Sequence, residues 1–187
     1  MTRAFSTFRR RCAWGALACA LGLAFALFSQ YAWHLNPCPL CIFQRVALAG
    51  AGLFFLLGFA FGPTKRWAQA LWMTGTGIFA AAGVGIAGRH VWLQSLPPSE
   101  VPSCGPGLEF LLEAFPLQQA LAFVLRGSGE CAAVEGRFLG LSMPGWTLVL
   151  FSGLVLWAVL AVAWPRRPSK ALVVISLPVE NKAHDAV

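Results

Sequence analysis

Charged residues are scarce in this sequence. They make up 11% of its 187 residues, whereas 58% of the residues are hydrophobic. A soluble domain of this size carries about 25% charged residues, so the deficit is large. The long uncharged segments argue for an integral membrane protein, and no segment resembles a separate soluble domain. Internal repeats and low-complexity segments are also lacking. Because no segment resembles a separate soluble domain, we expect residues 1–187 to form a single membrane domain.

Four apolar runs are long enough to cross a bilayer, because about 20 apolar residues span its hydrocarbon core. They cover residues 13–33, 42–62, 67–88 and 146–164. The first run also suits a secretory signal, because it follows an Arg-rich start and contains Ala24-Phe25-Ala26. The run continues through Leu27 and Phe28, which favours a retained helix. The sequence therefore predicts an all-α membrane protein, a bundle of four transmembrane helices.

The basic residues lie on one side of this four-helix arrangement. Ten of the fourteen lysines and arginines flank the runs on that side: Arg3, Arg9, Arg10, Arg11, Lys65, Arg66, Arg166, Arg167, Lys170 and Lys182. The positive-inside rule then places both termini and the tail 165–187 in the cytoplasm, and loops 31–40 and 89–145 outside. Five of the seven acids lie in loop 89–145. The net charge of +7 thus reflects topology and not a nucleic-acid partner.

The second outer loop, residues 89–145, has few signs of a compact fold. Prolines interrupt it at Pro97, Pro98, Pro102, Pro106 and Pro116. In its middle, Leu108–Leu125 sets Glu109 and Glu113 among leucines and phenylalanines. This pattern predicts a short helix lying on the membrane interface, interrupted at Pro116.

Six cysteines fall into three pairs: Cys12 and Cys19, Cys38 and Cys41, Cys104 and Cys131. We expect the first pair, in an apolar run, to be small buried hydrophobic residues. The other four lie on the outer side, where disulfides persist if that space is oxidising. Two structural disulfides are one interpretation. A bridge between Cys38 and Cys41, however, closes a very small loop and restrains little of the unfolded chain, which favours a redox couple.

The spacing of the outer cysteines does not favour a metal site. Cys104 and Cys131 stand 27 residues apart, and neither a second C-x-x-C nor a close pair of histidines accompanies the first motif. Residue 42 is isoleucine and not histidine, so the motif is not a c-type haem site either. We therefore predict no bound metal.

Local chemistry around Cys41 suits a reactive thiol. Pro39 fits the first turn of a helix, where its missing N–H costs nothing. Cys41 then lies at a helix start, where free N–H groups and the helix dipole favour a thiolate. Arg45, four residues on, shares its helix face. It is a candidate to stabilise that thiolate or to bind the carbonyl of an acceptor, although interfacial arginines also extend to lipid headgroups with no chemical task.

Several segments together resemble the DsbB family of bacterial disulfide-forming membrane proteins. The matching segments are Cys38-Pro39-Leu40-Cys41-Ile42-Phe43-Gln44-Arg45, His90-Val91-Trp92-Leu93-Gln94, Ser103-Cys104-Gly105-Pro106, Gly129-Glu130-Cys131 and Phe138–Trp146. The likeness extends from about residue 10 to residue 165, with four helices and two outer loops in matching order. Pro39 is a permissible variant of a variable position, and Gln44 stands where some members have an acid.

This resemblance implies a redox relay in the bacterial inner membrane, with both loops in the periplasm. Cys104 is the cysteine expected to be attacked by a reduced DsbA-like thioredoxin-fold protein, and Cys131 is its resolving partner. Electrons are expected to pass through a transient Cys38–Cys131 bridge to the Cys38–Cys41 couple, and from Cys41 to a membrane quinone, ubiquinone or menaquinone.

The resemblance also implies two quinone-binding residues. Arg45 is expected to assist the quinone, and His90 to lie near the same headgroup, with an interfacial histidine of no chemical role as the alternative for His90. Two other functions stay open: a non-enzymatic membrane interaction protein with two structural disulfides, and a quinone reductase resembling vitamin K epoxide reductase.

Overall fold

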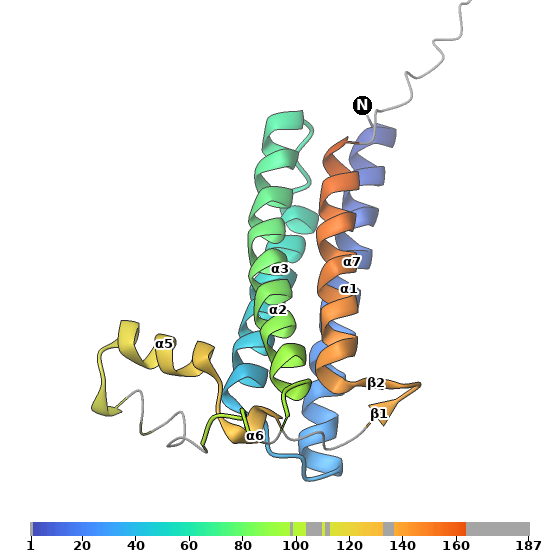
Figure 1. Ribbon diagram of the computed structural model, residues 1–187. Helices are drawn as coiled ribbons and strands as arrows, with labels where there is room; N and C mark the ends of the chain where they lie inside the picture. The colour runs from blue at the N-terminus through green and yellow to red at the C-terminus, as the bar shows by residue number, and fades with distance from the viewer. Residues whose placement is uncertain (1, 98, 104–109, 111–112, 133–136, 164–187) are drawn as a thin grey trace, which may run out of the picture.

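Four long helices run side by side in the computed structural model, which describes residues 2–97, 99–103, 110, 113–132 and 137–163 (Figure 1). They are α1 (Thr2–Ala32), α2 (Pro39–Phe61), α3 (Arg66–Gln94) and α7 (Met143–Ala163). Each is long and apolar enough to cross a membrane. The predicted all-α bundle of four membrane-spanning helices is confirmed. The start of α1 and the end of α7 lie at the same end of the bundle (Figure 1).

Helix α3 is longer than the apolar run that predicted it. The run ends at Gly88, but the helix continues to Gln94 and so carries Arg89 and His90. Arginine and histidine interrupt hydropathy without breaking a helix, because neither restricts the backbone as proline does nor adds the backbone freedom of glycine. Two residues expected at the start of the outer loop therefore lie on a rigid helix.

Small residues let the helices of the bundle approach one another closely. A Cβ atom at Gly52 would lie 3.1 Å from Cys19 Cβ, and one at Gly58 would lie 3.0 Å from Cys12 Sγ. Glycine therefore faces cysteine twice along the contact between α1 and α2, as is common between membrane helices. Cys12 and Cys19 are 0% and 1% exposed, which confirms that they are buried core residues.

Short elements gather at the other end of the bundle: α5 (Leu117–Arg126), α6 (Gly129–Ala132) and a hairpin of β1 (Arg137–Phe138) and β2 (Leu141–Ser142) (Figure 1). The hairpin pairs Arg137 with Ser142 and Phe138 with Leu141. Its two-residue turn has positive φ at Leu139 and Gly140, the requirement of a type I′ turn. The hairpin was not predicted. The predicted short helix is found as α5, which begins directly after Pro116, whereas residues 104–109 and 111–112 lie outside the described part of the chain.

Arg89 fastens the end of α5 to α3. Its Nε donates to the carbonyl oxygen of Leu125 at 3.2 Å, and one terminal nitrogen donates to that of Arg126 at 2.8 Å. Carbonyl groups in the last turn of a helix have no partner within the helix, and a cation there also favours the helix dipole. The chain then turns at Gly127, whose φ is +82° and which lies against Leu93. This attachment brings α6 over the ends of α2 and α3.

Candidate active site

Cys38 and Cys41 form the start of α2. Cys38 is the N-cap residue with extended backbone, Pro39 opens the helix, and the amide N–H of Ile42 donates to the Cys38 carbonyl oxygen at 3.2 Å. The helix start expected for this motif is confirmed. The two side chains are half-buried free thiols whose sulfurs lie 3.2 Å apart, with Cys38 as the donor and Cys41 as the acceptor. A disulfide between them needs only a small change of side-chain position.

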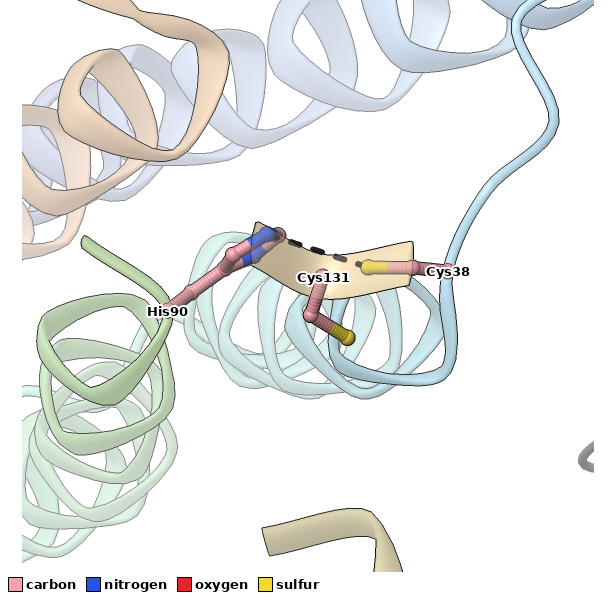
Figure 2. A group of neighbouring side chains, drawn as sticks. All are labelled: Cys38, His90 and Cys131. Carbon is pink, nitrogen blue, oxygen red and sulfur yellow. Dashed lines mark hydrogen bonds between the residues drawn. The ribbon is translucent and has the colours of Figure 1, made fainter. Parts of the chain in front are cut away.

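Cys131 reaches the same place from α6. Cys131 is 1% exposed, and its Sγ lies within 4.8 Å of both Cys38 Sγ and a ring nitrogen of His90. Figure 2 shows these three side chains converging from α6, the start of α2 and the end of α3. Cysteines expected to cooperate across two loops are therefore brought together. The fourth outer cysteine, Cys104, lies outside the described residues.

The three thiols lie next to one another, and their interactions have a direction. A hydrogen bond with Cys38 raises the pKa of the Cys131 thiol above its ordinary value, and burial raises this pKa further. Cys131 thus keeps its proton, and Cys38 in turn donates to Cys41. Since each donor stabilises negative charge on the sulfur that it faces, this arrangement favours Cys41 as the sulfur that carries the charge.

His90 contacts Cys38 with one ring nitrogen and α2 with the other. It is 3% exposed, and its Nε2 lies 3.8 Å from Cys38 Sγ (dashed in Figure 2). Its Nδ1 lies 3.1 Å from Gln44 Nε2. The structure therefore places His90 beside Cys38.

Two residues that the sequence reasoning missed hold this histidine. Gln44 is 5% exposed, and its Oε1 accepts a 2.7 Å hydrogen bond from the hydroxyl of Thr147, which lies 2.9 Å from the Pro144 carbonyl oxygen. A signal for Gln44 was present, because a glutamine three residues after Cys41 falls on the same helix face. No sequence signal connects Thr147 with residues a hundred positions earlier.

Arg45 extends from α2 to α1. Its guanidinium donates to the Gln30 side-chain oxygen and to the Ala26 carbonyl oxygen, the second at 3.0 Å. Both bonds hold the guanidinium one helix turn beyond Cys41, between α1 and α2. A guanidinium has five N–H donors, so these two bonds leave others for a bound acceptor.

The structure offers a set of possible metal ligands at the cysteine site and an apolar groove away from it. Cys38, His90 and Cys131 present two sulfurs and one imidazole nitrogen, which are ligand types that a soft metal ion prefers, although the prediction of no metal stands untested. Apolar space lies elsewhere, between α1 and α7, in a groove of about 390 Å³. Trp14, Gly15, Ala18, Val149, Leu150, Gly153, Leu154 and Trp157 line it.

Comparisons with known proteins place this arrangement in a family. The family model described as "Disulfide bond formation protein DsbB" matches residues 8–161. A protein of Chromobacterium violaceum named disulfide bond formation protein B is 49% identical over 152 residues, which are 81% of this chain and 91% of the relative. Proteins of the same name from Nitrosococcus oceani and Xanthomonas euvesicatoria are 51% and 46% identical, over 76% and 87% of this chain and 86% and 95% of their own lengths. The chain, with Cys38, Cys41 and Cys131 gathered at one end of a four-helix membrane bundle, belongs to the DsbB family of disulfide bond formation proteins.

Proposed function

We propose that this protein is a membrane thiol oxidase that reoxidises a periplasmic DsbA-like dithiol protein and delivers the electrons to a membrane quinone. One observation carries the proposal. Cys131 lies far from Cys38 in the sequence, yet its sulfur lies within 4.8 Å of the Cys38 sulfur, which is itself 3.2 Å from Cys41. Thiol–disulfide exchange requires this proximity between an attacking and an attacked sulfur.

The relay begins with a disulfide between Cys104 and Cys131 and another between Cys38 and Cys41. A thiolate of the reduced partner attacks Cys104, the Cys104–Cys131 bond breaks, and Cys131 leaves as a thiolate. The second partner thiol then displaces Cys104, so the partner leaves as a disulfide. Two electrons and two protons now reside on Cys104 and Cys131.

The second exchange moves these electrons to α2. Cys131 attacks Cys38, a Cys38–Cys131 bond forms, and Cys41 leaves as a thiolate. Cys104 next attacks Cys131, which re-forms the first disulfide and releases Cys38. The hydrogen bond that Cys41 accepts from Cys38 supports this direction, because it favours negative charge on the leaving sulfur.

The acceptor side of the proposal depends on Cys41 and Arg45. A bound quinone supplies the electron sink, taking up two electrons and two protons as the Cys38–Cys41 disulfide re-forms. The residues present fit such a group: Arg45 keeps unused donors near Cys41, and the apolar groove between α1 and α7 suits an isoprenoid chain. Contact of His90 with Cys38 supports a role for this histidine in thiol exchange at least as well as one in quinone binding.

The membrane placement follows from the same features. The N-terminal end of α1 and the end of α7 lie together, and the cysteine site occupies the opposite end (Figure 1). With the basic residues at the first end, the positive-inside rule assigns that end to the cytoplasm and the cysteines to the periplasm of a bacterial inner membrane.

The decisive experiment mixes purified protein, a reduced DsbA-like protein and a soluble quinone, and follows quinone absorbance. We expect quinone loss matched by partner disulfide formation, and loss of both in Cys41→Ser. Cys12→Ser is the matched control, because it changes a cysteine of the bundle core. Quinone consumption that persists in Cys41→Ser would contradict the relay, and stable disulfides without quinone consumption would indicate a structural role.

A trapping experiment tests the assignment of the two loops. In Cys131→Ser, the mixed disulfide between Cys104 and the partner lacks its resolving thiol and should accumulate. Mass spectrometry of the trapped complex should identify Cys104. Attachment of the partner to Cys38 instead would reverse the proposed order of exchange.

A further inference from the structure

A buried hydrogen-bond network of Thr147, Gln44 and His90 lies next to Cys38, and the proposed relay gives this network no role. We propose that Gln44 and Thr147 are positioning residues that keep the proton of neutral His90 on Nε2, so that the ring donates a hydrogen bond to the Cys38 sulfur. The role of this hydrogen bond in catalysis rests on the proposed function, whereas the position of the His90 proton does not.

Donor and acceptor types in the network fix the position of the proton. Gln44 Nε2 is an amide NH₂ and can only donate, so His90 Nδ1, at 3.1 Å, must accept with its lone pair. A neutral imidazole carries one proton, which then lies on Nε2. Nε2 is the nitrogen 3.8 Å from Cys38 Sγ. The single S–H of Cys38 is directed at Cys41, which leaves the Cys38 sulfur as the acceptor from His90.

Thr147 determines which end of the Gln44 amide faces the ring. Its hydroxyl has one proton and faces two oxygens that can only accept, Gln44 Oε1 at 2.7 Å and the Pro144 carbonyl oxygen at 2.9 Å. The shorter contact is with Gln44 Oε1, and it turns the NH₂ group toward His90. Gln44 is 5% exposed and His90 is 3% exposed, so water does not readily replace these partners. A buried polar group without a partner is costly, and this cost holds the network in one arrangement. Three helices are involved, since Gln44 lies on α2, His90 on α3 and Thr147 on α7.

The consequence concerns the step in which Cys38 is released. When Cys104 attacks Cys131 of the Cys38–Cys131 bridge, the electron pair of the broken bond remains on Cys38. An N–H donor facing that sulfur stabilises the charge that develops there, as donors do for other leaving groups. His90 thus contacts a reacting atom, and Gln44 and Thr147 act through His90.

Nitrogen NMR tests the proton position without a partner or a quinone. The full-length protein, ¹⁵N-labelled at histidine and reduced in a lipid nanodisc, is compared with Gln44→Glu, and His90 is assigned through His90→Asn. We expect Nε2 to be protonated and Nδ1 unprotonated in the original protein. A carboxylate can only accept, so Gln44→Glu should place a proton on Nδ1. Protonated Nδ1 in the original protein, or an unchanged ring in Gln44→Glu, overturns the proposal.

A kinetic arm tests Thr147 in a protein whose Cys41, Cys104 and Cys131 are replaced by serine. Alkylation of Cys38 reports the negative charge available on its sulfur. We expect Thr147→Val to slow it on the order of tenfold and Thr147→Ser to restore it, because a hydrogen bond to a charged group is among the stronger ones. Thr76→Val is the matched control, since Thr76 is a buried helical threonine whose hydroxyl donates to the Trp72 carbonyl oxygen of its own helix.

Equal alkylation rates in Thr147→Val and Thr76→Val contradict the positioning role of Thr147. The result for the ring proton stands apart from the relay: a confirmed Nε2 proton with no quinone consumption would reject the proposed function and retain the network. Quinone consumption together with a proton on Nδ1 would retain the oxidase and reject the network.

Discussion

Cys19 and Cys131 are equally buried, at 1% exposed, but their neighbours differ completely. Cys19 lies in the bundle against the backbone of Gly52, where it fills space between α1 and α2. Cys131 lies at the end of the bundle where α2 begins and α3 ends, with a sulfur and an imidazole nitrogen within 4.8 Å. Burial alone therefore does not determine what a cysteine can do in this protein; the polar and reactive groups beside it do.

The two regions also differ in how they are held together. In the bundle, glycine and cysteine allow close packing between α1 and α2. At the end that carries the cysteine site, α5 and α6 are held by a buried apolar cluster of Leu40, Leu93, Val124 and Cys131 and by the bonds from Arg89 to the end of α5. Substitutions in the bundle should thus affect stability, and substitutions at the outer end should affect exchange between cysteines.

The largest expected difference comes from removing one sulfur in each region. Cys131→Ala should lower the oxidase rate by on the order of 10³-fold or more, because an intramolecular attack is replaced by none. Cys19→Ala should leave the rate within about twofold and lower the free energy of unfolding by about 1 kcal/mol, the cost of a small cavity. Quinone absorbance measures the rate, and thermal denaturation measures the stability.

Two outcomes would contradict this contrast. Loss of oxidase activity in Cys19→Ala, in protein that remains folded, would give the bundle cysteine a redox role. Retained activity in Cys131→Ala would show that the electrons bypass α6. Cys12→Ala provides a second bundle variant, since Cys12 is 0% exposed and lies beside Gly58.

A smaller effect is expected from the contact that positions α6. Arg89→Ala removes two hydrogen bonds to the carbonyl oxygens of Leu125 and Arg126, and so frees the end of α5. We expect formation of the Cys38–Cys131 bridge to slow by about tenfold, because charge-assisted hydrogen bonds each contribute on the order of one to a few kcal/mol. The rate is measured with a mild oxidant in protein that carries Cys41→Ser and Cys104→Ser.

Arg126→Ala is the control for this experiment. Like Arg89→Ala, it removes one positive charge near the end of α5, but it keeps the backbone carbonyl that Arg89 binds. Equal slowing in both variants would mean that charge near α6, and not the attachment of α5, controls the exchange.

Hydropathy and spacing were sufficient for the bundle and for the start of α2. Four apolar runs gave the four long helices, and Pro39 between two cysteines gave a helix start with Cys41 in its first turn. These features are local, so a window of sequence contains them. The roles of Cys38, Cys41, Cys104, Cys131, Arg45 and His90 came from the family resemblance, and they stay predictions.

The remainder of the site depends on contacts between distant segments. The contact of His90 with Cys38 arises because α3 continues past Gly88 and turns this residue inward, whereas its expected place near a quinone stays a prediction. Arg89, expected in a loop, binds α5 from the same helix. Thr147 touches Gln44 only because α7 packs against the outer ends of α2 and α3. Periodicity within one segment carries no information on such pairs.

The smallest expected effect concerns how the alkylation rate of Cys131 depends on pH. The hydrogen bond with Cys38 and burial raise the pKa of its thiol, so the protonated form persists to higher pH than in an ordinary cysteine. Alkylation requires the thiolate. In the reduced protein, the alkylation rate of Cys131 should therefore still rise with pH above about 9.5, where an unperturbed thiol of pKa about 8.5 is mostly ionised and approaches its plateau.

Removing Cys38 should shift this profile in a known direction. Cys38→Ala takes away the hydrogen bond, which is the larger cause of the raised pKa, and leaves burial in place. The pKa of Cys131 should fall, and its alkylation at pH 8, followed by mass spectrometry, should quicken by roughly a few-fold, since the rate follows the thiolate fraction. An unchanged profile would mean that burial alone sets the pKa of Cys131. The chemical difference from Cys19 would then lie only in which sulfur Cys131 can reach.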